Sequence, residues 1–111
     1  MQTRFHVVAL GEGMLEFNQT RAGEPNFLQG FGGDTSNAAI AAARAGASTA
    51  YLTRVGEDAF GRALLDLWQR EGVDTQAVQT DSSAATGIYF VTHGANGHEF
   101  SYMRAGSAAS R

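Results

Sequence analysis

Residues 32–39 read Gly32-Gly33-Asp34-Thr35-Ser36-Asn37-Ala38-Ala39, two glycines set against the start of an alanine-rich segment. Glycine lets a backbone approach a ligand closely, and the free N–H groups of a helix's first turn attract oxygen-rich ligands. Asp34 and Asn37 lie three positions apart, so both side chains reach the same turn and can bind hydroxyl groups. The stretch indicates either a ligand-facing helix start or an ordinary capped helix after a tight turn.

The same stretch opens a predicted helix. Asp34 or Thr35 is expected to cap it, the body runs over residues 36–45, and Gly46 is expected to end it. Alanine is the best helix former. One narrow face is expected to lie close to a sheet, and it is formed by Ala38, Ala39, Ala42 and Ala45.

Strands and a second helix are predicted around this one. The apolar run at residues 5–10 is typical of a strand buried on both faces, and residues 48–55 read as one strand ending at Gly56. The strand–helix–strand order favours parallel pairing with a right-handed crossover. A second helix is predicted over residues 58–71, capped by Asp58, with a short strand at residues 75–80 after it.

Shorter strands are predicted at residues 14–17 and 26–29, and a β-hairpin at residues 87–104. The hairpin turns at Gly94-Ala95-Asn96-Gly97 and carries several aromatic side chains. His93 and His98 flank this turn. Without a carboxylate partner they are interpreted as surface residues rather than as a metal site, and no metal site is predicted.

Composition excludes several chemistries. The 111 residues hold eight arginines, no lysine and no cysteine, so a lysine Schiff base, a phosphate-loop lysine, a disulfide and a zinc–thiolate site are excluded. The net charge of −3 argues against a nucleic-acid partner. No apolar run is long enough for a membrane span or a signal peptide, so a cytoplasmic location without membrane association is expected.

Three stretches together resemble the N-terminal signature of the ribokinase-like (PfkB) carbohydrate kinases. They are residues 32–39, the Ala45-Gly46-Ala47 segment and residues 54–61, which read Arg-Val-Gly-Glu-Asp-Ala-Phe-Gly. Within the family, residues 11–17 and 102–109 look most like 2-keto-3-deoxygluconate kinases. Fructokinases and ribokinases share much of the pattern and stay open as alternatives.

The resemblance implies an α/β fold, a ribokinase-like three-layer sandwich of which residues 1–111 form the N-terminal part. A small β-sheet lid over the sugar is implied, with strands within residues 12–29 and 87–104. Because lids of two subunits clasp one another in many relatives, a homodimer through the lid is also implied. The aromatic hairpin residues then serve lid or interface packing as an alternative to ligand binding.

The resemblance further implies substrate-binding residues. They are Gly33, Asp34 and Asn37 facing the sugar hydroxyls, Tyr89 and Tyr102 covering the substrate, and Arg104 meeting the carboxylate of a keto-deoxy sugar acid. A guanidinium suits that last role because its planar fork binds a carboxylate through two hydrogen bonds. A surface strand arginine and packing tyrosines are the structural alternatives. Either Glu12 or Glu16 is expected to supply a further polar sugar contact.

The implied activity is ATP-dependent phosphorylation of a sugar or sugar acid, with ATP and Mg²⁺ as cofactors. The family's catalytic base lies in a C-terminal Gly-Ala-Gly-Asp motif, and the sequence to Arg111 contains none. The base and the ATP-binding part are therefore expected beyond Arg111, and the 111-residue chain alone is predicted to be inactive. A non-catalytic sugar-binding or lid-mediated dimerisation fragment is the alternative from another class.

Overall fold

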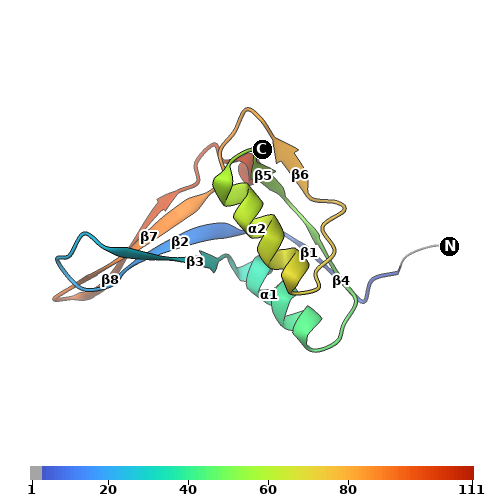
Figure 1. Ribbon diagram of the computed structural model, residues 1–111, viewed down its shortest axis with the longest axis horizontal. Helices are drawn as coiled ribbons and strands as arrows, with labels where there is room; N and C mark the ends of the chain where they lie inside the picture. Colours follow the sequence, from blue (N-terminus) through green and yellow to red (C-terminus); the bar gives the residue numbers. More distant parts are fainter. Residues whose placement is uncertain (1–3) are drawn as a thin grey trace.

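The computed structural model describes residues 4–111. A body of two helices and short parallel strands carries a sheet that projects to one side, the left in Figure 1. The described part is elongated and flat, with extents of 55 × 34 × 19 Å. The two parts meet where the first helix begins.

In the body, β1 (Val7–Leu10) pairs in parallel with β4 (Thr49–Leu52), and α1 (Asp34–Arg44) packs against both. The predicted parallel pairing is confirmed. The expectation that the first strand is buried on both faces is wrong for the described chain, since Val8 is 55% exposed and Leu10 is 74% exposed. One face lies towards α1, and no described element covers the other.

The predicted single strand at residues 48–55 is also wrong, because the chain changes partners at Thr53. β4 pairs with β1, whereas β5 (Arg54–Gly56) pairs in parallel with β6 (Gln79–Asp81). The Thr53 carbonyl accepts a hydrogen bond from the Gln79 N–H, and this bond draws β6 alongside. The strand predicted at residues 75–80 therefore starts at residue 79. It follows a turn in which the Val78 N–H donates a hydrogen bond to the Thr75 carbonyl.

The N-cap of α1 is Gly33, with φ 107° and ψ 124°, and no side chain caps the helix. The predicted caps Asp34 and Thr35 are thus wrong: Asp34 is the first helical residue, and the Thr35 hydroxyl bonds the Tyr51 hydroxyl at 2.7 Å. Glycine is required at position 33 because the positive φ disfavours a side chain, and a Cβ would overlap the Glu12 carbonyl. At the other end Gly46, with φ 94°, follows the helix as predicted.

The buried face of α1 differs from the predicted one. Ser36 and Ala39 are buried, whereas Ala38 and Ala45 are exposed. The helix turns its serine inward because the buried Trp68 indole donates a 2.8 Å hydrogen bond to the Ser36 hydroxyl. A polar group at the core side of the helix is therefore satisfied by a partner that no local pattern reveals.

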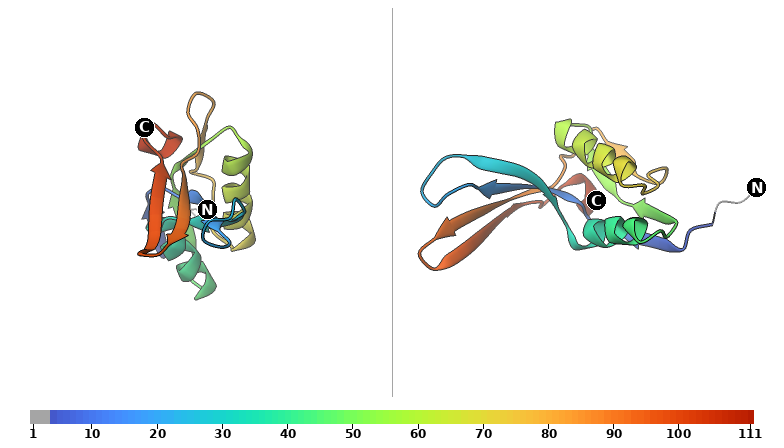
Figure 2. Two further views of the ribbon diagram at one scale, coloured as in Figure 1. Left: turned by 90° about the vertical axis from the view of Figure 1, so that its left-hand side faces the viewer. Right: turned by 60° about the horizontal axis from the view of Figure 1, so that its bottom comes forward.

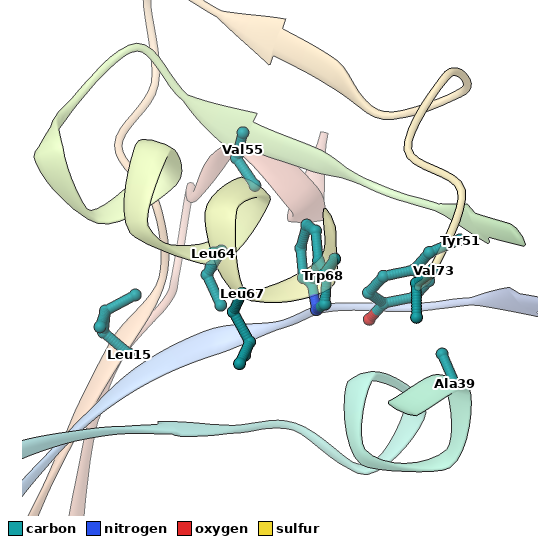
Figure 3. Close-up of a cluster of buried hydrophobic side chains, with 8 residues drawn as sticks. All are labelled: Leu15, Ala39, Tyr51, Val55, Leu64, Leu67, Trp68 and Val73. Atoms are coloured by element: carbon teal, nitrogen blue, oxygen red, sulfur yellow. The ribbon is translucent and has the colours of Figure 1, made fainter. Parts of the chain in front are cut away.

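Helix α2 (Ala59–Arg70) begins at the predicted cap, since the Asp58 carboxylate accepts from the Gly61 N–H at 2.7 Å. Its buried side chains Leu64, Leu67 and Trp68 face the core shown in Figure 3. The Trp68 ring meets the Tyr51 ring edge to face at 4.8 Å between centroids. Residues from strands and both helices thus share one core, formed by Leu15, Ala39, Tyr51, Val55, Leu64, Leu67, Trp68 and Val73.

Four strands form the projecting sheet, which we call the lid sheet. In spatial order it contains β3 (Phe27–Gly32), β2 (Met14–Gln19), β7 (Ile88–Gly94) and β8 (Gly97–Met103). β2 and β7 are parallel and the outer pairs are antiparallel. The predicted hairpin is confirmed, and the two shorter strands extend beyond their predicted ends. A 3₁₀ turn, η1 (Ala108–Ser110), follows and lies near β5.

The lid sheet has two different faces, as expected from the two-residue period of a strand. On one face Phe17 stacks on Phe90 at 5.4 Å and meets Phe60 of α2 at 5.7 Å between ring centroids. This aromatic contact ties the root of the sheet to the body, while its far end extends away, as Figure 2 shows. The opposite face carries Tyr89 and Tyr102.

Candidate functional site

A cavity of about 420 Å³ lies between the start of α1 and the lid sheet. Its lining residues are Glu12, Met14, Gly33, Asp34, Thr35, Asn37, Tyr89, Phe100, Tyr102 and Arg104. All six substrate-binding residues expected from the sequence are among them. Cavities of this size commonly hold small ligands, and this one has room for a molecule as large as a monosaccharide.

The helix end supplies hydroxyl-binding groups. Asp34 and Asn37 lie on the first turn of α1, and among the described residues no hydrogen bond engages either side chain. The Asn37 N–H already bonds the Gly33 carbonyl at 2.9 Å, so the side chains rather than this amide are free for a ligand. A carboxylate accepts from a hydroxyl group, while a carboxamide both accepts and donates.

The lid sheet supplies an aromatic wall. Tyr89 on β7 and Tyr102 on β8 are direct cross-strand partners with ring centroids 5.5 Å apart. Phe100, two residues before Tyr102, is stacked with it at 6.4 Å. The apolar faces of such rings pack against the C–H faces of a sugar, and the phenol oxygens add polar contacts at their edge.

Arg104 lines the cavity beside the Tyr102 ring. Its guanidinium carbon lies 5.6 Å from the centre of the Tyr102 ring, and Nη1 lies 3.9 Å from Glu12 Oε1. Glu12 is itself held, because Oε2 accepts a 2.7 Å hydrogen bond from the Ser107 hydroxyl. The Arg104 side chain remains 57% exposed, so its donors can reach an anionic group in the cavity.

The hydroxyl of Tyr89 is bound by a residue that does not line the cavity. It donates a 3.1 Å hydrogen bond to Glu16 Oε1. Burial, reinforced by this carboxylate, raises the pKa of Tyr89 to about 12. The phenol is therefore protonated at neutral pH, and its oxygen keeps lone pairs for a ligand.

Two lining residues, Met14 and Phe100, were not predicted. Alternation along a strand could have found them, because each lies two residues from a predicted polar or aromatic position, Glu16 or Tyr102. Thr35 was expected to cap α1 and instead lines the cavity. Its contact with Tyr51 joins positions 16 residues apart, which no local pattern predicts.

The histidines lie away from this cavity. His93 Nδ1 is 2.7 Å from His98 Nδ1 across the hairpin, and His93 Nε2 is 2.8 Å from Asn18 Oδ1. His98 is exposed, as predicted, whereas His93 is half-buried. Both lie in the strands β7 and β8 rather than in the turn. Within residues 4–111 no group of three or more metal-ligating side chains is found.

Comparison with known proteins identifies the family of the chain. The pattern of the pfkB family carbohydrate kinases matches residues 4–111. The chain belongs to this family. PfkB proteins are transferases that phosphorylate sugars.

The similar proteins include kinases named for two different sugars. Fructokinase-1 of Zea mays is 41% identical over 108 residues, covering 92% of this chain and 33% of the maize protein. The 2-dehydro-3-deoxygluconokinase of Thermoproteus tenax is 38% identical over 112 residues, covering 95% of this chain and 34% of the relative. The chain thus spans about a third of the length of these relatives.

Solved PfkB structures confirm the predicted fold, the N-terminal part of a ribokinase-like α/β protein. A PfkB protein from Polaromonas sp. JS666 superposes with a TM-score of 0.91 at 33% identity, covering 97% of this chain and 38% of that one. A fructokinase from Xylella fastidiosa with bound ATP gives 0.86 at 31% identity, covering 93% and 31%.

Residues 56–61, within the third stretch of the PfkB signature, lie outside the cavity lining and have a structural role. Asp58 caps α2, and its Oδ2 also accepts from the Thr86 N–H at 3.0 Å. A Cβ on Gly61 would overlap the Gly56 carbonyl, and one on Gly56 would lie 2.6 Å from the Thr86 nitrogen. The glycines allow this close packing.

No described helix has the length and apolar character that a membrane crossing needs.

Proposed function

We propose that this chain is the sugar-recognising part of an ATP-dependent kinase whose substrate is 2-keto-3-deoxygluconate. Membership of the PfkB family supports the reaction class, and the 38% identity with a 2-dehydro-3-deoxygluconokinase supports the substrate. The observation that carries the proposal is the presence of Arg104, Asp34 and Asn37 in one cavity.

The chemistry of these groups matches a sugar acid. Asp34 accepts hydrogen bonds from hydroxyl groups, Asn37 accepts and donates, and Gly33 lets the ligand approach the backbone. Arg104 offers paired donors to the carboxylate. Tyr89 and Tyr102 cover the ligand from the lid sheet. These six residues form the proposed substrate site.

ATP and Mg²⁺ are assigned to residues beyond Arg111, together with the base that accepts the proton of the sugar hydroxyl. ATP binding is supported by the Xylella fastidiosa fructokinase structure, which contains ATP. The chain has no lysine to hold phosphates, and the described residues hold no cluster of metal ligands. The phosphoryl-transfer step is therefore not assigned to the residues of this chain.

Fructose is the second candidate substrate, because the maize fructokinase is 41% identical to the chain. A neutral sugar has no carboxylate for Arg104 to bind. In that case Arg104 would serve the structure through Glu12 and the Tyr102 ring, contacts that it already makes. The two substrates are thus distinguished by what Arg104 contributes to binding.

Titration of the ¹⁵N-labelled chain followed by NMR tests the proposal. With 2-keto-3-deoxygluconate, we expect the amide resonances of Gly33, Asp34 and Asn37 to shift at millimolar concentration, and fructose to shift them less. Larger shifts with fructose would favour the second candidate, and no shift with either sugar would contradict sugar binding. ADP formation by the purified chain would contradict the placement of the base beyond Arg111.

We also propose that the lid sheet mediates a homodimer. Dimerisation through this sheet would also be the role of the chain if it were a non-catalytic fragment. Every residue of β8 is exposed, and Met103 is 60% exposed while Leu28 on β3 is 69% exposed. Exposed apolar side chains on an edge strand are typical of an interface. The size of the chain in solution tests this proposal.

A further inference from the structure

One row of residues crosses the lid sheet and contains a half-buried hydrogen bond between Glu16 and the cavity-lining Tyr89. In spatial order the register aligns Gly30 on β3, Glu16 on β2, Tyr89 on β7 and Tyr102 on β8. Because directly paired residues project from the same face of a sheet, Glu16 and Tyr89 lie side by side. Tyr89 lines the cavity, whereas Glu16 does not.

The two glycines of β3 on this face make room for the pair. A Cβ on Gly32 would overlap the Tyr89 hydroxyl and lie 2.6 Å from ring carbon Cε1. The Tyr89 ring therefore reaches across β2 and ends over Gly32, beside the start of α1. A Cβ on Gly30 would lie only 3.2 Å from Glu16 Oε2, which is the movable end of that side chain.

The hydrogen bond sets the direction of the Tyr89 hydroxyl. An ionised carboxylate only accepts, so the phenol hydrogen points towards Glu16, at 3.1 Å between the oxygens. The phenol lone pairs are then left for the cavity. One hydroxyl group of a ligand would then donate to the Tyr89 oxygen, and another would donate to the Asp34 carboxylate.

We propose that Glu16 is a positioning residue: it holds the Tyr89 hydroxyl over Gly32 as a hydrogen-bond acceptor for a ligand hydroxyl, without touching the ligand. The inference rests on the proposed sugar-binding function. The sequence led us to expect either Glu12 or Glu16 as a sugar contact. Glu12 lines the cavity, whereas Glu16 does not and acts through Tyr89. Gly32 also gains a role, since the missing side chain is the space that the Tyr89 ring occupies.

A double-mutant cycle separates an indirect role from a direct one. Dissociation constants for 2-keto-3-deoxygluconate are measured by NMR for the 111-residue chain and for the Glu16→Gln, Tyr89→Phe and doubly substituted chains. We expect Glu16→Gln to weaken binding by about fivefold, as for one hydrogen bond, and to have less than about a twofold effect once Tyr89 is Phe. Equal effects in both backgrounds, or no effect in either, would overturn the proposal.

A second readout needs no ligand. With ¹³Cζ-labelled tyrosine, the Tyr89 resonance at neutral pH is expected to move in Glu16→Gln and in Gly32→Ala. It is expected to stay in place in the matched control Gly94→Ala at the far end of β7, where a Cβ would meet nothing nearer than the Gly97 carbonyl at 4.0 Å. An unmoved resonance in Glu16→Gln would overturn the positioning role. If the resonance moves while the unsubstituted chain binds no sugar, the proposed function fails and Glu16 still sets the Tyr89 hydroxyl.

Discussion

The hydroxyl of Thr86 donates a 2.8 Å hydrogen bond to Asp58 Oδ1 and accepts one of 2.8 Å from the Gly56 N–H. Thr86 lies just before the lid strand β7, and Asp58 caps α2. The pair therefore joins the root of the lid sheet to the body. It also explains structurally why a carboxylate stands between two glycines in residues 56–61.

Replacement of Asp58 by Ala is expected to lower the free energy of unfolding by about 1–3 kcal/mol, since it removes the helix cap and leaves the Thr86 amide without its acceptor. Urea denaturation followed by the fluorescence of Trp68, the single tryptophan, measures the change. Asp66→Ala on the same helix is the matched control. Its ion pair with Arg70 is exposed, so a change within about 0.5 kcal/mol is expected.

Asp58 also predicts a pH dependence of stability. Burial alone would raise the pKa of this carboxyl, but hydrogen bonds from Thr86 and Gly61 outweigh burial and lower the pKa below its ordinary value of 3.8. Since the folded pKa is the lower one, the stabilisation is present above pH 3.8 and is lost as the pH falls towards the folded value. Denaturation between about pH 5 and pH 2 should show a shallower loss for Asp58→Asn than for the unsubstituted chain. Parallel curves would contradict this.

Ser36→Ala is expected to destabilise the chain by about 1–3 kcal/mol, because the buried Trp68 indole N–H would lose its acceptor. Thermal unfolding by circular dichroism measures the effect. Ala38→Ser on the exposed side of α1 introduces a hydroxyl where solvent reaches it, and a change of about 0.5 kcal/mol or less is expected there. A neutral Ser36→Ala would show that the indole finds another partner.

Arg104→Ala is expected to weaken binding of 2-keto-3-deoxygluconate by at least about tenfold, the order of one charge-assisted pair, and binding of fructose by much less. The comparison uses NMR-derived dissociation constants for both ligands. Arg62→Ala, an exposed arginine on α2, controls for the change in net charge. An equal loss for the two ligands would refute a carboxylate contact and would favour the neutral-sugar candidate.

Met103→Asp is expected to shift the chain towards the monomer, because a charge on the exposed edge strand β8 cannot be buried against a second copy without cost. Light scattering coupled to size-exclusion chromatography measures the mass. Ser110→Asp, in the turn after the lid sheet, is the control and should leave the mass unchanged. A monomer before any substitution would contradict the lid-mediated homodimer.

Much of the fold follows from local sequence signals. Helix ends at Asp58 and Gly46 depend on side-chain oxygens and positive φ angles that few residues can supply. The hairpin at residues 87–104 follows from two β-rich runs around a glycine-containing turn. Where the local signals predicted wrongly, a contact with a residue far along the chain explains the difference. The Trp68 indole binds Ser36 on the buried side of α1, and the Gln79 N–H binds the Thr53 carbonyl where β4 ends.

The candidate site divides in the same way. By itself the sequence determined which residues have hydroxyl- and carboxylate-binding chemistry, because Asp34, Asn37 and Arg104 carry that chemistry wherever they lie. Only the tertiary structure decided that Glu16 meets Tyr89, which is 73 positions away. Strand register is a long-range property. The parallel pairing of β2 with β7 places Glu16 beside Tyr89, and the missing side chain at Gly32 leaves room for the Tyr89 ring. Glu16 therefore supports Tyr89 instead of contacting the ligand.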